Sequence, residues 1–193
     1  MDLKNKCEIV IIGGGIAGSS LAYHLAKLKK TDVTLLERHQ LTSGTTWHAA
    51  GLIMQLRSTH SLTEIAKYNV ELYSTLESET GVATGFKQNG TLGVARTKDR
   101  MHETKTIASI AKSFNIQAEM ISPSEAKNIY PTLNKECIEG AIYIPKDGQT
   151  NPVDTTISLI SGAKKLGVSV HENIEVIDLK QNSDQSFSVF TKD

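Results

Sequence analysis

The sequence predicts an α/β fold organised around a parallel β-sheet, and three observations near its N-terminus carry this prediction. An unbroken apolar run, Ile9 to Ile12, is typical of a strand buried on both faces of a parallel sheet. Glycines follow at G-x-G-x-x-G spacing and open a segment with helical periodicity. A second apolar strand, residues 33–36, ends at Glu37, about twenty residues after the last glycine. Together these features predict a β-α-β unit that binds a dinucleotide.

Each glycine of the turn has its own physical role. Gly13 permits the sharp turn out of the strand, Gly15 lets the backbone approach a pyrophosphate, and Gly18 lets the helix pack close to the sheet. The helix then directs its unpaired N–H groups and its positive dipole end at the phosphates. Glu37 would accept hydrogen bonds from ribose hydroxyls and would repel the 2′-phosphate of NADP. The motif therefore predicts FAD or NAD and does not choose between them.

A long helix is expected after an ordered loop over residues 38–56 that contains one helical turn. Ser61 and Glu64 have the S-x-x-E spacing of a capping box, and Gly81 is a natural terminator. Apolar residues at helical spacing predict a stripe that faces the core. Its members are Leu62, Ile65, Leu72 and Leu76.

The later elements predict how the chain is divided. Mixed strands and helices follow the long helix. Asn151 then caps a helix that leads to a strand over residues 168–170, able to rejoin the first sheet, and to its continuation over residues 172–179. Residues 1–193 are thus expected to be one domain, with a nucleotide-binding part over residues 1–58 and 150–180 and part of a substrate-facing subdomain over residues 82–149. Because a doubly wound sheet normally has further parallel strands, we expect this domain to be incomplete.

Composition narrows the class of partner. The 193 residues carry 21 basic and 21 acidic side chains, so no electrostatic search for nucleic acid or for an anionic membrane is indicated. A small molecule is the expected partner. Cys7 and Cys137 have no C-x-x-C spacing, which indicates neither a metal site nor a disulfide framework. The chain is expected to be cytoplasmic, or to lie in the mitochondrial matrix if a presequence has been removed.

The loop after the second strand carries the most specific pattern. Residues 41–52 are L-T-S-G-T-T-W-H-A-A-G-L. With the glycine motif and Glu37-Arg38, this stretch resembles the N-terminal part of the dimethylglycine and sarcosine dehydrogenases, which are D-amino-acid-oxidase-like FAD-dependent oxidoreductases. The resemblance covers essentially the whole chain. It implies a Rossmann-like FAD-binding domain of the glutathione-reductase and D-amino-acid-oxidase type, interrupted by part of an α+β substrate domain.

The resemblance also implies the cofactor-binding residues. His48 would be bonded covalently to the flavin 8α-methyl carbon, which suits the chemistry of a neutral imidazole nitrogen as a nucleophile. The loop would wrap the flavin, the start of the helix would lie under the pyrophosphate, and residues near the strand ends would meet the adenosine. The full set is Gly13, Gly15, Ile16, Ala17, Gly18, Glu37, Arg38, Gly44, Thr45, Thr46, Trp47, His48, Ala49, Ala50, Gly51, Leu52 and Val176.

The implied reaction is oxidative N-demethylation of dimethylglycine- or sarcosine-type amines, with hydride transfer to covalently bound FAD and release of a one-carbon unit. The family's catalytic acid and base residues are expected beyond Asp193, so this chain alone is expected to be inactive and to bind FAD poorly. Tetrahydrofolate would take part only if a C-terminal folate-binding module exists beyond this chain. The sequence does not identify the amine or the electron acceptor.

Two other hypotheses remain open from the sequence. A non-catalytic relative that resembles the regulatory subunit of pyruvate dehydrogenase phosphatase would use the same fold to bind a partner protein. An NAD-dependent dehydrogenase would share the glycine motif, but nothing in such enzymes requires the S-G-T-T-W-H stretch at residues 43–48.

Overall fold

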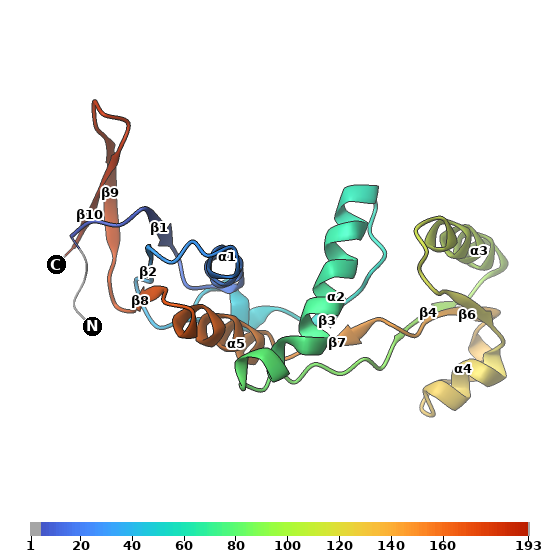
Figure 1. Cartoon of the computed structure of the whole chain (residues 1–193). Helices are drawn as coiled ribbons and strands as arrows, with labels where there is room; N and C mark the ends of the chain where they lie inside the picture. The colour runs from blue at the N-terminus through green and yellow to red at the C-terminus, as the bar shows by residue number, and fades with distance from the viewer. Residues whose placement is uncertain (1–4, 193) are drawn as a thin grey trace. The chain divides into compact units, whose positions relative to one another are not determined.

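The computed structural model describes residues 5–192, which form two compact units (Figure 1). Unit 1 contains the chain up to Gly51, then Thr75–Gly85, then the chain from Asn151 onward. Unit 2 contains Leu52–Ser74 and Phe86–Thr150. The division places residues 52–58 with unit 2 and residues 181–192 with unit 1. The roles expected for the two parts, nucleotide binding and substrate binding, stay predictions.

Unit 1 is built on a three-stranded parallel sheet in the order β1-β2-β8. The strands are β1 (Ile9–Ile12), β2 (Val33–Leu36) and β8 (Ser169–His171). All four residues of the central strand β2 are buried, as expected for an apolar strand with a neighbour on each side. The prediction that a strand late in the chain rejoins the first sheet is confirmed, because β8 pairs with β2.

Two helices of unit 1 pack against each other, α1 (Ile16–Lys27) and α5 (Pro152–Lys165) (Figure 1). Asn151 caps α5 as predicted, because its Oδ1 accepts hydrogen bonds from the N–H groups of Val153 and Asp154. Gly162 allows the close helix contact, since a Cβ there would lie 2.6 Å from the ring of Tyr23. The helix that follows the glycine turn is thereby supported along its buried side.

Helix α2 (His60–Thr80) differs from its predicted start. Thr59, and not Ser61, caps it, because Thr59 Oγ1 accepts from the N–H of Leu62 at 3.4 Å. The helix begins two residues earlier than the Ser61 cap requires, which puts Ser61 inside the first turn. The predicted stripe is also only half right: Leu72 and Leu76 are buried, whereas Leu62 and Ile65 are exposed. Ala66 and Val70 are the buried apolar residues between them.

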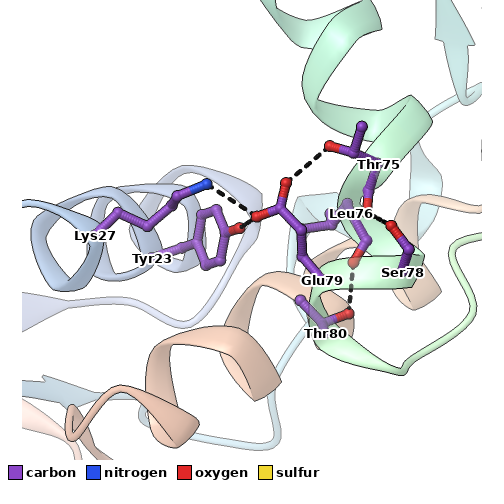
Figure 2. Close-up of polar contacts among 7 residues, drawn as sticks. All are labelled: Tyr23, Lys27, Thr75, Leu76, Ser78, Glu79 and Thr80. Atoms are coloured by element: carbon purple, nitrogen blue, oxygen red, sulfur yellow. Dashed lines mark hydrogen bonds and ion pairs between the residues drawn. The ribbon is translucent and has the colours of Figure 1, made fainter.

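The last turn of α2 belongs to unit 1 and contacts α1 through one carboxylate (Figure 2). Glu79 Oε2 accepts from Tyr23 Oη at 2.6 Å and from Lys27 Nζ at 2.9 Å, and Glu79 Oε1 accepts from Thr75 Oγ1 at 2.8 Å. These hydrogen bonds, the one from Tyr23 first, lower the pKa of Glu79 to about 2. Burial raises the pKa of Tyr23, and the Glu79 carboxylate adds to that rise.

Unit 2 contains a three-stranded antiparallel sheet in the order β4-β6-β5. Its core includes Ala111, Ile116, Ile142 and Ile144. A capping box begins α4 (Pro123–Ile129), because Ser122 Oγ accepts from the N–H of Glu125 and Glu125 Oε2 accepts from the N–H of Ser122. The elements of unit 2 besides α2 are β3 (Leu52–Ile53), β4 (Thr91–Ala95), α3 (Lys98–Ser113), β5 (Glu119–Ile121), α4 (Pro123–Ile129), η2 (Lys135–Cys137), β6 (Gly140–Ile144) and β7 (Gly148–Gln149).

The end of unit 1 forms a separate hairpin of β9 (Val176–Gln181) and β10 (Phe187–Thr191). The sequence predicts that residues 172–179 continue the strand that precedes them, and this expectation is wrong. Asn173 has a φ of +61°, which breaks the extended conformation and turns the chain out of the first sheet. This segment therefore pairs with β10 instead of extending β8.

Among the residues from 5 to 192, no helix is both long and apolar enough to cross a membrane. The same stretch of chain contains no group of His, Cys, Asp or Glu side chains arranged to hold a metal ion.

Candidate functional site: the glycine turn and the loop over residues 38–51

The glycine turn at the end of β1 requires two residues that have no Cβ. Gly13 has a φ of +106°, a conformation that side chains disfavour, and its N–H donates to Leu36 O at 2.8 Å. A Cβ on Gly18 would lie 2.0 Å from the carbonyl oxygen of Gly13. The helix can therefore begin directly behind the turn only because residue 18 has no side chain. Both roles match those predicted from the spacing.

Glu37 holds this turn from the end of β2. Its Oε2 accepts from the N–H of Gly14 at 2.6 Å, and its Oε1 accepts from the N–H of His39 at 2.9 Å. The carboxylate thus connects the turn to the segment that leaves β2. Each carboxylate oxygen has a further lone pair, so these bonds leave Glu37 able to accept from a hydroxyl.

The loop after β2 folds back onto the turn. The N–H of Thr42 donates to Gly14 O at 3.3 Å, and Thr46 Oγ1 accepts from the N–H of Ile16 at 3.0 Å. Thr46 is buried at 6% exposure within the short 3-10 helix η1 (Thr45–His48). Residues about thirty positions apart, which the sequence placed in one site by resemblance, are therefore in contact in unit 1.

Trp47 and His48 point out of this anchored loop. Both side chains are exposed, and Trp47 is 58% exposed. Their rings lie 3.8 Å apart between centroids, with an angle of 34° between the ring planes. The imidazole of His48 is thus open to a ligand on the side that Trp47 does not cover, and the indole offers an apolar surface beside it.

The remaining predicted residues are distributed as follows. Arg38 is exposed and lines a hollow of about 180 Å³ at the carboxyl ends of β2 and β8. Val176 begins β9, and Ile174 before it donates from its N–H to Glu37 O at 2.9 Å. Leu52 lies in strand β3 of unit 2, where it pairs with Gln149. Unit 1 therefore brings together the predicted set apart from Leu52.

Glu172 contributes to this arrangement, and the sequence reasoning did not select it. Its Oε2 accepts from the N–H of Leu41 at 2.9 Å, which fastens the start of the loop beside the end of β8. The signal available in the sequence was its position directly after a parallel strand, since the carboxyl ends of such strands meet at one edge of the sheet.

The first turn of α1 fits an anionic group. The N–H groups of Ala17 and Gly18 have no acceptor in the part of the chain that the structure describes, and no side chain caps the helix from Gly15. Free N–H groups at a helix N-terminus attract a phosphate through hydrogen bonds and through the helix dipole. The turn, the open N–H groups and Glu37 together have the arrangement that an adenine dinucleotide requires.

This geometry defines a dinucleotide-binding α/β protein, and sequence comparison gives the family. The model of the FAD dependent oxidoreductase family matches residues 8–192, so the chain belongs to that family. The predicted family is thereby confirmed.

Individual relatives agree with this assignment. Mitochondrial sarcosine dehydrogenase of Mus musculus is 40% identical over 94% of this chain and 20% of its own length. Mitochondrial dimethylglycine dehydrogenase of Rattus norvegicus is 39% identical over 97% of this chain and 22% of its own length. The mitochondrial pyruvate dehydrogenase phosphatase regulatory subunit of Mus musculus is 36% identical over 91% of this chain and 20% of its own length. The chain thus spans about a fifth of these curated relatives.

A solved structure confirms the fold class. The crystal structure of L-proline dehydrogenase from P. horikoshii superimposes with a TM-score of 0.91 at 31% identity. The superposition covers 98% of this chain and 50% of that chain. The α/β fold of an FAD-binding oxidoreductase is therefore confirmed for the described residues.

Proposed function

We propose that the protein is an FAD-dependent amine oxidoreductase that N-demethylates dimethylglycine- or sarcosine-type amines, with FAD bonded covalently to His48. The observation that carries the proposal is the placement of His48. It is exposed at the end of η1, while Thr46, two residues before it, contacts the start of α1. Identity of 40% to a sarcosine dehydrogenase supports the substrate class.

The residues of unit 1 would divide the binding of FAD among them. The open N–H groups of Ala17 and Gly18 would hold the pyrophosphate, and Glu37 would accept from the adenosine ribose. The exposed imidazole of His48 would form the bond to the flavin, with Trp47 as an apolar wall. Bound FAD would supply the two-electron acceptor for oxidation of the N-methyl group.

The covalent bond can be tested directly. The protein at its full natural length is precipitated with acid, and flavin fluorescence is measured in the pellet and in the supernatant. We expect the flavin in the pellet, and we expect His48→Ala to move it to the supernatant. His39→Ala is the matched control, because His39 is an exposed histidine of the same segment. Flavin released intact from the unmodified protein would contradict covalent attachment.

The substrate class needs a separate test. Under anaerobic conditions, sarcosine or dimethylglycine should bleach the flavin absorbance of the full-length protein, and glycine should not. The 36% identity to a pyruvate dehydrogenase phosphatase regulatory subunit favours one other candidate, a non-catalytic protein that binds a partner. A full-length protein that retains FAD and is bleached by neither amine would support that candidate and contradict the oxidoreductase.

A further inference from the structure

We propose that Thr46 is a positioning residue for covalent flavin attachment, because it links the pyrophosphate-binding end of α1 to the histidine loop. This inference rests on the proposed function. Thr46 would act through the protein backbone: its hydroxyl holds the N–H of Ile16 at 3.0 Å and so sets where η1 lies relative to the first turn of α1. The position of η1 would in turn set the position of His48, which lies two residues after Thr46.

Residues on both partners favour the contact between Thr46 Oγ1 and the start of α1. Thr46 is buried at 6% exposure, although its neighbours Thr45 and Trp47 are exposed. A Cβ on Gly15 would lie 3.0 Å from Thr46 Oγ1, so the glycine at that position leaves room for the threonine hydroxyl. The second glycine of the motif therefore accommodates a protein side chain as well as a phosphate.

The local geometry of η1 carries the position of Thr46 to His48. The N–H of Ala49 donates to Thr46 O at 3.1 Å, which closes the turn that contains His48. Thr46 thus faces inward at the turn, and His48 faces outward from it. Because the turn spans only three residues after Thr46, a shift of Thr46 would be passed almost completely to the imidazole.

The hydrogen bond between Thr46 and Ile16 also determines which N–H groups at the start of α1 are left for a ligand. Since the N–H of Ile16 donates to Thr46, the N–H groups left for an anion in the first turn are those of Ala17 and Gly18. The pyrophosphate and the histidine loop would then be held by neighbouring N–H groups of one rigid helix turn. Such an arrangement fixes the distance between the two ends of the cofactor site.

The test compares three variants of the full-length protein. Thr46→Val keeps the shape and removes the acceptor, whereas Thr46→Ser keeps the hydroxyl. Thr34→Val is the matched control, because Thr34 is also buried in unit 1 but its hydroxyl has no partner among the described residues. Apoprotein is mixed with FAD, and the fraction of flavin in the acid pellet is followed with time and compared with the total flavin bound.

We expect Thr46→Val to slow covalent attachment about fivefold, the effect of one lost hydrogen bond. Thr46→Ser should restore the rate, and Thr34→Val should leave it unchanged. Hydrogen exchange measured on the apoprotein should show faster exchange of the Ile16 amide in Thr46→Val alone. This second measurement does not depend on FAD.

The outcomes separate this inference from the proposed function. If the unmodified protein binds FAD without a covalent bond, the covalent part of the proposed function fails. If the unmodified protein attaches FAD and Thr46→Val does so at the same rate, the role of Thr46 is refuted while the proposed function stands. Equal losses in Thr46→Val and Thr46→Ser would assign Thr46 a packing role and would also refute the proposal.

Discussion

Glu37 and Glu79 are both glutamates of unit 1 that use both carboxylate oxygens, but their partners differ in kind. Glu37 accepts from the backbone N–H groups of Gly14 and His39. Glu79 accepts from side chains, which include Tyr23 and Lys27 (Figure 2). Backbone donors are fixed once the turn forms, whereas Tyr23 and Lys27 are in reach of Glu79 only when α1 and α2 are packed together.

The comparison separates two physical roles. A carboxylate bound to backbone determines the shape of a ligand-binding turn, and its loss would disturb binding directly. A carboxylate bound to side chains joins two helices at a partly exposed position, where solvent weakens each ion pair. Glu37 should therefore matter for the site, and Glu79 for stability and its dependence on pH.

The largest effect is expected when the turn that Glu37 holds is broken. Gly18→Ala would place a Cβ 2.0 Å from Gly13 O, and backbone atoms on both sides must shift. We expect a loss of about 3 kcal/mol in the free energy of unfolding, measured by urea denaturation. Ala17→Ser, at an exposed position of the same helix turn, should change stability by less than about 0.5 kcal/mol. Equal stability of the two variants would contradict the close contact.

Glu37→Gln tests the carboxylate that accepts from backbone N–H groups. The amide keeps one acceptor oxygen, so either Gly14 or His39 would face an NH₂ group in place of an acceptor. We expect a loss of about 1 to 2 kcal/mol in stability and weaker FAD binding, measured by urea denaturation and by flavin titration. Glu77→Gln, at an exposed position of α2, should leave both unchanged. Unaltered FAD affinity in Glu37→Gln would remove Glu37 from the site.

Glu79→Gln tests the carboxylate that is bound to side chains. We expect a loss below about 1 kcal/mol in the free energy of unfolding, because the Glu79 side chain is 36% exposed. The pKa of Glu79 is about 2 in the folded protein against an ordinary value of 4.5 for a glutamate side chain. The carboxylate therefore contributes its full stability above pH 4.5, and this contribution is lost as the pH falls from 4.5 towards 2.

Urea denaturation at several pH values measures this effect. The difference between the unmodified protein and Glu79→Gln should be constant from pH 5 to 7 and should shrink below pH 4.5. Glu77→Gln again provides the control. A difference that grows as the pH falls would have the wrong sign and would contradict the assigned pKa shift.

The smallest expected effect is an increase in stability. Ser19 is fully buried in α1, and its hydroxyl has no partner within the described residues. Ser19→Ala removes this hydroxyl and introduces a better helix former, so we expect stability to rise by about 0.5 kcal/mol. Thermal denaturation would show a small increase in Tm. A decrease would indicate that the hydroxyl binds a buried water.

The sequence predicted most of the first sheet and its turn correctly. The apolar run of β2 reflects burial on two faces, and the glycine spacing reflects backbone approach without a Cβ. The same burial was expected of β1 and is wrong, because β1 lies at the edge of the described sheet and only its Ile11 is buried. The start of α2 was mispredicted, because Ser61 and Thr59 are both competent caps and the choice depends on where the preceding chain arrives. The path after β8 was mispredicted because the strand-like pattern of residues 172–179 does not reveal which sheet these residues join.

The sequence by itself determined the α/β class and the residues that form the glycine turn, since both depend on residue types at short spacing. The family followed from the resemblance of residues 41–52 and the glycine motif to known proteins. The tertiary structure decided which partners these residues take. Thr46 contacts Ile16, and Glu172 fastens Leu41, through pairings of segments far apart in the chain. Such pairings follow from the order β1-β2-β8 and from the return of the loop, which no local pattern contains.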